Sequence, residues 1–236
     1  MKIIKENNFT YRLLIEQINR SFNIKGSKIL DIGCGAGTLS FYLASKGALV
    51  TGVDISKKAV QECMNSSNIL NLKHAKFIHS YFPTGFSSRT KYDYIVFTEV
   101  IEHLEDDESA IKKIAKLLEA DGILLLSTPS ITAPLYRLGL TRDFDVQVGH
   151  LRRYSLEQLR NLLKTNDFKI IREVKSEGIL RNFLFINPHA GKLVRYINRF
   201  GSNIVTKIDN ITLRLFGESN YIIVAKKTNK KKKKVG

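Results

Sequence analysis

The sequence predicts a doubly wound α/β fold: a mostly parallel sheet of seven strands, with helices on both faces and a helical insertion between strands six and seven. Strand-like and helix-like periodicities alternate five times over residues 9–130, which is typical of a parallel sheet with right-handed crossovers. The strands are nearly continuous apolar runs, as expected where helices cover both faces. We expect one domain over residues 1–227, because a chain of 236 residues can bury a single large core.

Seven short apolar runs are predicted to form the strands. The first run ends at Asp31, and Asp54 is the polar end of the second. Because ligands bind outside the carboxyl ends of parallel strands, we expect both carboxylates near a ligand site. In chain order, the predicted strands cover residues 27–31, 48–55, 75–81, 92–100, 122–130, 168–175 and 220–227.

The segments between these runs space their apolar residues as helices do. Ser56 is a predicted N-cap, since its hydroxyl can accept a hydrogen bond from a free amide of the first turn, and Ser155 has the same role later in the chain. The predicted helices cover residues 9–22, 38–46, 57–70, 107–120 and 156–163.

The composition excludes several classes of protein. No apolar run approaches the ~18–20 residues that span a bilayer, and residues 1–14 lack the apolar stretch of a signal peptide. Cys34 and Cys63 supply neither a disulfide framework nor a four-ligand zinc site. We therefore expect a cytoplasmic protein with two free thiols, in which any membrane contact is peripheral and at the inner surface.

The chain is strongly basic, with a formal net charge of +16. Seven lysines and no acidic residue occur in residues 226–234, and such a segment cannot bury enough surface to order itself. We expect a disordered lysine-rich tail at residues 228–236. The remaining charge has two interpretations: contact with nucleic acid or an anionic surface, or a bias of composition.

Three glycines, Gly33, Gly35 and Gly37, follow the first predicted strand. A glycine-rich turn leaves backbone groups open to a ligand, although glycine also serves simple tight turns. Asp54 can accept hydrogen bonds from both hydroxyls of a ribose. The spacing from Asp31 is D-x-G-x-G-x-G rather than G-x-G-x-x-G. A carboxylate suits a cationic ligand better than phosphates, which disfavours the alternative of a dinucleotide-dependent oxidoreductase.

This stretch resembles the first motif of the class I S-adenosylmethionine-dependent methyltransferases, and the similarity extends over about residues 25–175. The resemblance implies that Asp31 and the glycine backbone hold the methionine part of the cofactor. It also implies that Asp54 binds the ribose and that Ile55 lies against the adenine. Many relatives carry an acid after strand three, where this chain has Tyr81. The implied cofactor-binding set is Asp31, Gly33, Cys34, Gly35, Gly37, Asp54, Ile55 and Thr98.

A second motif, E-x-x-E-H, follows the fourth strand, where the methyl acceptor is expected. A helical turn through Glu99, Glu102 and His103 would put all three on one face. Such hard oxygens with one nitrogen suit Mg²⁺ or Mn²⁺, and no thiolate accompanies them to favour zinc. Alternatively, the glutamates form a solvated first helical turn and His103 only packs. For a hydroxyl acceptor, His103 or Glu99 is the predicted catalytic base.

His150 follows the fifth strand, on the same rim of the sheet. Together with E-x-x-E-H, it resembles two groups: the quinone-pathway O-methyltransferases and the small-RNA 3′-terminal 2′-O-methyltransferases. In the second group four such residues hold a metal, and the matching residues here are Glu99, Glu102, His103 and His150. The flanking stretch VQVGHLRRYS looks more like the quinone-type enzymes. The resemblance therefore implies O-methylation of a quinone-like or other lipid-linked small acceptor, with RNA ribose 2′-O-methylation as the alternative.

The predicted insertion, at about residues 177–217, contains two basic amphipathic helical patterns within residues 191–217. Such helices either cover a face of the core, or form an acceptor lid or a contact with an anionic membrane. The apolar positions are Leu193, Ile197, Phe200, Ile204, Ile208, Ile211 and Leu215, and the basic positions between them are Lys192, Arg195, Arg199, Lys207 and Arg214.

Overall fold

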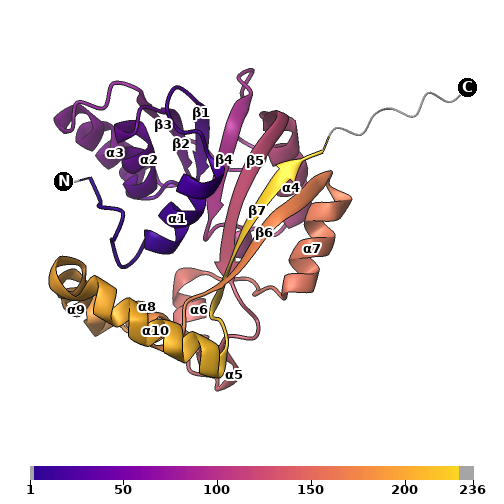
Figure 1. The fold of residues 1–236 in the computed structure, drawn as a ribbon. Helices are drawn as coiled ribbons and strands as arrows, with labels where there is room; N and C mark the ends of the chain where they lie inside the picture. Colours follow the sequence, from indigo (N-terminus) through magenta and orange to yellow (C-terminus); the bar gives the residue numbers. More distant parts are fainter. Residues whose placement is uncertain (1–2, 229–236) are drawn as a thin grey trace, which may run out of the picture.

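The computed structural model describes residues 3–228, without the side chains of residues 188, 191, 195, 199 and 200. Its centre is a seven-stranded sheet of order β3-β2-β1-β4-β5-β7-β6 (Figure 1). The strands from β3 to β5 are parallel, whereas β7 is antiparallel to both of its neighbours. The strands are β1 Lys28–Ile32, β2 Leu49–Asp54, β3 Ala75–His79, β4 Tyr92–Thr98, β5 Leu118–Pro129, β6 Phe168–Ser176 and β7 Asn220–Lys227. The predicted mostly parallel sheet is confirmed.

Successive residues of the central strands enter two hydrophobic cores, one on each face of the sheet. Leu124 and Leu126 of β5 belong to the core that contains residues of α4 and α7, whereas Leu125 belongs to the core of α1 and α2. This alternation follows from the two-residue period of a strand, and it explains why consecutive residues such as 123–126 are all apolar. The flanking helices are α1 Arg12–Ser21, α2 Thr38–Ser45, α3 Lys57–Ile69, α4 Asp107–Leu117 and α7 Leu156–Thr165.

The two predicted helix caps are confirmed. The Ser56 hydroxyl accepts a hydrogen bond from the backbone N–H of Ala59 (3.2 Å). The Ser155 hydroxyl accepts one from Gln158 N–H (3.2 Å), and the Gln158 side chain accepts from Ser155 N–H (2.8 Å), which completes a capping box. These caps fix where α3 and α7 begin.

The connection from β5 to α7 contains two short helices that the sequence pattern does not predict. They are α5 Pro134–Arg137 and α6 Arg142–Val148, and both are too short to show a clear apolar period. The helix predicted over residues 107–120 ends at Leu117, because the chain enters β5 directly at Leu118. The segment that follows the carboxyl end of β5 is therefore more helical than the sequence predicts.

The segment between β6 and β7 is helical, as predicted, and lies beyond the end of the sheet beside α5 and α6 (Figure 1). The sequence predicts two helices over residues 191–217, and the structure adds α8 before them. The elements are α8 Ile179–Ile186, the 3-10 turn η2 Pro188–Ala190, α9 Gly191–Tyr196, the π-helical turn η3 Ile197–Gly201 and α10 Ser202–Phe216. We call residues 177–217 the helical insertion.

The inner face of α10 is polar. Arg181, on α8, is 0% exposed, and its Nε lies 3.4 Å from Asp209 Oδ2 on α10. The guanidinium also donates to Thr206 Oγ1 (3.3 Å) and to the carbonyl of Phe9, whose ring it covers at 4.0 Å. A buried cation needs such partners, so polar residues of α10 turn inward to meet Arg181.

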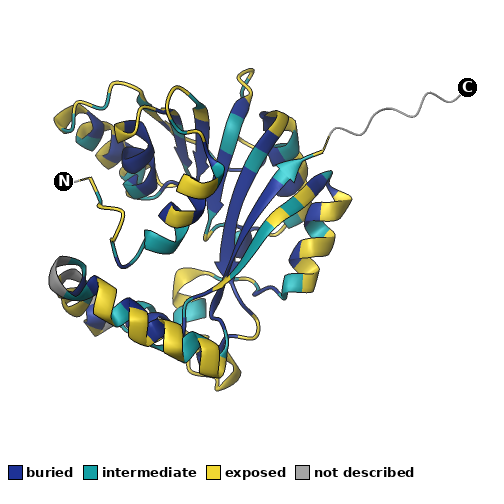
Figure 2. Cartoon of the chain, in the orientation of Figure 1, coloured by how far each residue is buried: buried dark blue, intermediate teal, exposed yellow. Residues whose placement is uncertain are grey.

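The apolar stripe of α10 consequently faces outward, within the exposed face of this helix that Figure 2 shows in yellow. The interpretation that these apolar residues cover a core face is wrong for α10, because the buried ion pair determines which face turns inward. The exposed stripe consists of Ile204 (66% exposed), Ile208 (47%), Ile211 (57%) and Leu215 (69%).

Within residues 3–228, no helix combines the length and apolar character that a membrane span needs. The last described residue, Thr228, donates its backbone N–H to the carbonyl of Asp167 (2.7 Å). The rest of the predicted lysine-rich tail lies outside the described residues.

Candidate active site

The loop after β1 holds three glycines in the left-handed region, with φ of 72° at Gly33, 49° at Gly35 and 74° at Gly37. At two of these positions, packing inside the protein leaves no room for a side chain. A Cβ on Gly33 would lie 2.3 Å from Val100 Cγ2, and a Cβ on Gly37 would lie 2.9 Å from Cys63 Sγ. Nothing lies within 4 Å of a Cβ built on Gly35. Of the three glycines, Gly35 is therefore the one whose missing side chain leaves open space for a ligand.

Two carboxylates frame this loop. Asp31 is 3% exposed, and its Oδ2 accepts a hydrogen bond of 2.6 Å from the Ser40 hydroxyl. Burial raises the pKa of Asp31 to about 6. Asp54 accepts hydrogen bonds from the backbone N–H groups of Gly35 and Ser56, each of 2.8 Å and each on a different oxygen. Asp54 therefore fixes the position of the loop.

A cavity of about 440 Å³ opens beside the loop. The predicted cofactor residues Asp31, Gly33, Cys34, Gly35 and Thr98 are among its lining residues. Its other lining residues come from α1, α2, α6, α8, the ends of β5 and β6, the start of β7, and the loops beside these elements. The cavity thus joins the predicted cofactor site to the helical insertion.

Three predicted cofactor residues lie outside the lining of this cavity: Gly37, Asp54 and Ile55. The Ile55 side chain is 64% exposed, while Gly37 packs against α2 and α3. Their contacts with the cofactor stay predictions.

Glu99 does not share a helical face with the rest of the E-x-x-E-H motif. Its φ is +54°, and the 3-10 turn η1 covers only Ile101–His103. Glu99 Oε1 instead accepts hydrogen bonds from Ser127 Oγ (2.6 Å) and Asn220 Nδ2 (2.9 Å), and Glu99 lines the cavity. The predicted helical turn through Glu99 is wrong, because this residue adopts left-handed backbone angles immediately before the turn begins.

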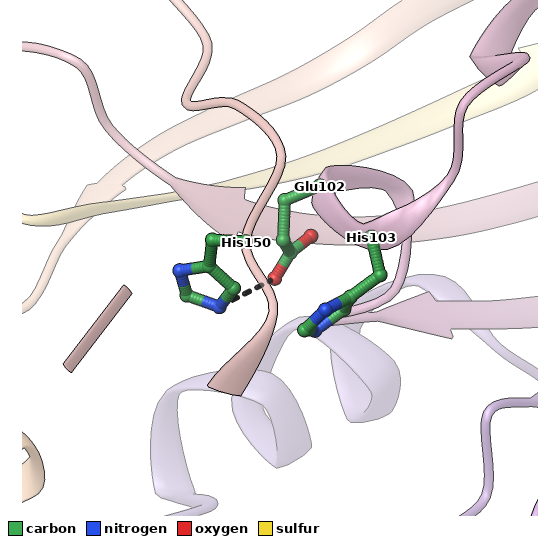
Figure 3. Close-up of side chains that lie close together, drawn as sticks. All are labelled: Glu102, His103 and His150. Atoms are coloured by element: carbon green, nitrogen blue, oxygen red, sulfur yellow. Dashed lines mark ion pairs between the residues drawn. The ribbon is translucent and has the colours of Figure 1, made fainter. Parts of the chain in front are cut away.

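The structure brings together the other three predicted metal ligands, Glu102, His103 and His150 (Figure 3). One ligand atom from each lies within 4.8 Å of the others. Glu102 is 0% exposed, and its Oε2 accepts from Thr128 Oγ1 (3.0 Å). Its Oε1 has no hydrogen-bond partner among the described residues and lies 3.8 Å from His150 Nε2. Burial, followed by the charge of Glu99, raises the pKa of Glu102 well above its usual range.

Hydrogen bonds orient both imidazoles. His103 Nδ1 lies 3.0 Å from the carbonyl oxygen of Gly149, and His150 Nδ1 lies 2.8 Å from Asp145 Oδ1. Both partners are acceptors, so each Nδ1 carries the hydrogen and each neutral ring leaves Nε2 free. Burial raises the pKa of Asp145, but hydrogen bonds from His150 and Arg153 outweigh it and lower the value to about 2. Histidines that bind metals commonly hold their second ring nitrogen in this way.

Several cavity residues escape the sequence patterns. They come from the end of β6, from α8 and from the start of β7. Because β7 is antiparallel, its first residues lie at the carboxyl edge of the parallel strands, where ligands bind. The only signal in the sequence was that these strand ends are polar. That signal does not place the residues at the ligand-binding edge unless the direction of β7 is known. The residues are Ser176, Glu177, Asn182, Ser219 and Asn220.

This strand order, with a glycine loop after β1 and an acid at the end of β2, defines the Rossmann-like fold of S-adenosylmethionine-dependent methyltransferases. Residues 6–173 match the family described as "Methyltransferase domain", and the chain belongs to this family. The chain forms an S-adenosylmethionine-dependent methyltransferase domain, so the alternative of a dinucleotide-dependent oxidoreductase is wrong.

Curated relatives carry the name ubiquinone biosynthesis O-methyltransferase. The protein of Glaesserella parasuis is 37% identical over 131 residues, which are 53% of this chain and 56% of that protein. The protein of Chromobacterium violaceum is 27% identical over 196 residues, which are 83% of this chain and 77% of that protein. The chain thus spans only about half the length of the first of these relatives.

A solved structure shares the fold. Magnesium protoporphyrin IX methyltransferase from Synechocystis PCC 6803, with bound SAH, matches with a TM-score of 0.64 at 22% identity. The match covers 93% of this chain and 82% of that chain. At this identity the likeness shows the fold alone.

Proposed function

We propose that this methyltransferase acts on a hydroxyl group of a quinone-like or other lipid-linked small acceptor. The observation that carries the proposal is the cavity, which joins the glycine loop to His150 and to an apolar wall formed by Phe144, Val148 and Phe185. A ring fits such a wall, and a hydroxyl on it would lie near polar groups. The names of the curated relatives support an acceptor of the quinone type.

The chain's own residues position the reactants and accept a proton. S-adenosylmethionine, when bound, supplies a methyl group on an activated sulfonium. The loop fits this cofactor, because the open space at Gly35 and the Asp31 carboxylate, which suits a cationic amino group, both line the cavity. The Glu99 carboxylate, which lines the cavity, is the proposed base for the acceptor proton when a metal occupies His103, and the free Nε2 of His103 is the proposed base when no metal is bound.

We assign a divalent metal to Glu102, His103 and His150. The buried, unpartnered Glu102 Oε1 and the two oriented imidazoles fit a cation. A metal here would lower the pKa of an acceptor hydroxyl. Because Glu99 is bonded elsewhere, the donors are two imidazoles and one carboxylate, which suit Mn²⁺ better than the other predicted ion, Mg²⁺.

The test is transfer of a labelled methyl group from S-adenosylmethionine to a total lipid extract and, separately, to total RNA. We expect label in the lipid fraction, complete loss of transfer in EDTA, and recovery with Mn²⁺ or Mg²⁺. Label in RNA instead would replace the proposed acceptor with the RNA ribose.

A variant separates the metal from the acceptor in the same assay. Glu102→Gln keeps the shape of the side chain but removes its charge, so it should raise the Mn²⁺ concentration needed for half-maximal transfer by at least about tenfold. The affinity for S-adenosylhomocysteine should not change. Glu105→Gln, at an exposed position of the next loop, is the matched control. Full transfer in EDTA would remove the metal assignment and leave the methyltransferase activity untouched.

We further propose that the outward face of α10 contacts an anionic membrane that holds the lipid-linked acceptor. The support is the exposed apolar stripe of α10, together with the exposed cations Lys207 and Arg214 on the same helix. An amphipathic helix with this combination binds anionic lipid through apolar burial and charge attraction.

Sedimentation with phosphatidylglycerol vesicles tests this contact. Replacing Ile204 and Ile208 with serine should weaken vesicle binding about tenfold or more, because each isoleucine loses apolar burial in the lipid. Raising salt from about 0.05 to about 0.5 M should weaken it as well, through screening. Ile69→Ser, on α3, removes an isoleucine that is even more exposed (77%) and should leave binding unchanged. Absence of vesicle binding in the unaltered protein would contradict the proposal.

A further inference from the structure

One wall of the cavity is polar, with three buried residues and two glutamates that are less buried, and most of its residues have no role in the proposed reaction. It is formed by the end of β4, the end of β6, the first turns of α8 and the start of β7. We call it the polar wall. Its residues are Glu99, Glu177, Asn182 (8% exposed), Ser219 (2% exposed) and Asn220 (7% exposed).

Three atoms of the polar wall are buried without a partner. Among the described residues, no hydrogen bond reaches Asn182 Oδ1, Ser219 Oγ or Asn220 Oδ1. The orientation of Asn220 is fixed, because its Nδ2 donates to Glu99 Oε1 (2.9 Å) and only the amide nitrogen can do so. Its oxygen is therefore an open acceptor. Buried polar atoms left in this state are costly, so a bound molecule is expected to satisfy them.

The polar wall also carries two carboxyl groups, those of Glu99 and Glu177. Glu177, at the end of β6, has φ of +61° and, within the described part of the chain, receives no side-chain or backbone hydrogen bond on its carboxylate. Burial and then the charge of Glu99 raise the pKa of Glu177 to about 8, although Arg181 opposes them. A carboxyl group with this pKa lacks a donor at close range.

The nearby cations do not supply that donor. Arg181 is committed to Asp209, to Thr206 and to the carbonyl of Phe9. Arg153 also lines the cavity, but two of its nitrogens donate to Asp145, at 3.0 and 2.6 Å. The polar wall thus presents hydrogen-bond acceptors and carboxyl groups, while the nearby arginines, Arg153 and Arg181, already have partners.

We propose that the polar wall is a specificity subsite that binds hydrogen-bond donors on the methyl acceptor, that is, a second hydroxyl or an ammonium group. The inference rests on the proposed function, and it adds that acceptors with a carboxylate or phosphate at this position are rejected. Glu177 and Asn182 belong to the helical insertion, so the insertion selects the acceptor as well as covering the site.

The experiment measures binding rather than turnover, so that its outcome is separable from the methyl-transfer assay. The full chain, saturated with S-adenosylhomocysteine, is titrated calorimetrically with catechol and with 1,2-dimethoxybenzene, which has the same ring but no donor. Benzylamine and benzoate form a second pair, which distinguishes an ammonium from a hydroxyl ligand. We expect the donor-bearing member of at least one pair to bind about tenfold more tightly than its partner.

Variants locate the preference. Glu177→Gln and Asn182→Leu should each reduce it at least about threefold, whereas Glu173→Gln, on β6 but outside the cavity lining, should not. The affinity for S-adenosylhomocysteine should stay unchanged in all three. A fall of tenfold or more in that affinity for Glu177→Gln would show that the wall serves the cofactor instead, and would overturn the proposal.

The unaltered protein provides a test that does not depend on whether the variants fold. Equal affinity within both probe pairs, or tighter binding of the dimethoxy and carboxylate members, overturns the polar wall as a donor-binding subsite. If the donor preference is found while no lipid or phenol accepts a methyl group, the proposed acceptor class fails and the subsite stands.

Discussion

Asp209→Ala should lower the free energy of unfolding by about 3–5 kcal/mol, because it leaves the charge of Arg181 buried without a partner. Arg181 is 0% exposed and Asp209 is 1% exposed. The same carboxylate accepts hydrogen bonds from the backbone N–H groups of Gly178 (3.0 Å) and Arg181 (2.8 Å). The substitution therefore leaves these two N–H groups without an acceptor as well. Urea denaturation, followed by circular dichroism, measures the loss.

An exposed ion pair is the control for this prediction. Arg160 and Glu173 lie 2.5 Å apart, with the arginine side chain 53% exposed. Glu173→Ala should cost less than about 1 kcal/mol, because solvent already screens this pair. Equal losses in the two variants would show that the Arg181–Asp209 pair contributes no more than a surface pair does.

Gly33→Ala should lower the free energy of unfolding nearly as much as Asp209→Ala does, and the reason is steric. The left-handed φ of 72° costs a residue with a Cβ about 1–2 kcal/mol. The new Cβ would also lie 2.3 Å from Val100 Cγ2, and overpacking of this kind costs about 1–3 kcal/mol. We therefore expect a loss of about 2–5 kcal/mol in the free energy of unfolding.

Two further variants separate strain from crowding in the glycine loop. Gly33→Ala combined with Val100→Ala should recover part of the loss, because the clashing methyl group is gone. Gly35→Ala should cost less stability than Gly33→Ala, since nothing lies within 4 Å of its new Cβ, but it should weaken S-adenosylhomocysteine binding measured by calorimetry. If Gly35→Ala proved the more destabilising of the two, the roles assigned to these glycines would be reversed.

Elements whose apolar residues face a core were predictable from the sequence. The strands and α1 to α4 belong to this group, because burial on a sheet imposes a period of two or of about 3.6 residues. The carboxylates at the ends of β1 and β2 followed from the same reasoning. The pattern failed for α10, because Arg181 and Asp209 bury its polar face and turn Ile208 outward. The spacing of apolar residues shows that a helix has an apolar face and a polar face. Which face is buried depends on contacts with residues far away in the sequence.

The site was predictable only where residues are close in sequence or share an edge of parallel strands. His103 and His150 meet because both follow parallel strands, but the left-handed backbone at Glu99 removes that residue from their group. Asn220 reaches the cavity because β7 is antiparallel, and Glu177 reaches it because β6 pairs with β7 and ends at the same edge; no local pattern encodes either placement.

The position of β7 also determines the order in which the sheet is completed during synthesis. β3, β2, β1, β4 and β5 need no residue beyond 129 to pair with one another. β6 is made next but touches only β7 in the sheet, so it has no partner strand until residues 220–227 have been translated. While residues 130–219 are being added, β5 keeps an unpaired edge on the nascent chain, and such edges are sites of aggregation. Co-translational folding of this protein therefore has a vulnerable interval whose end is set by the synthesis of its last strand.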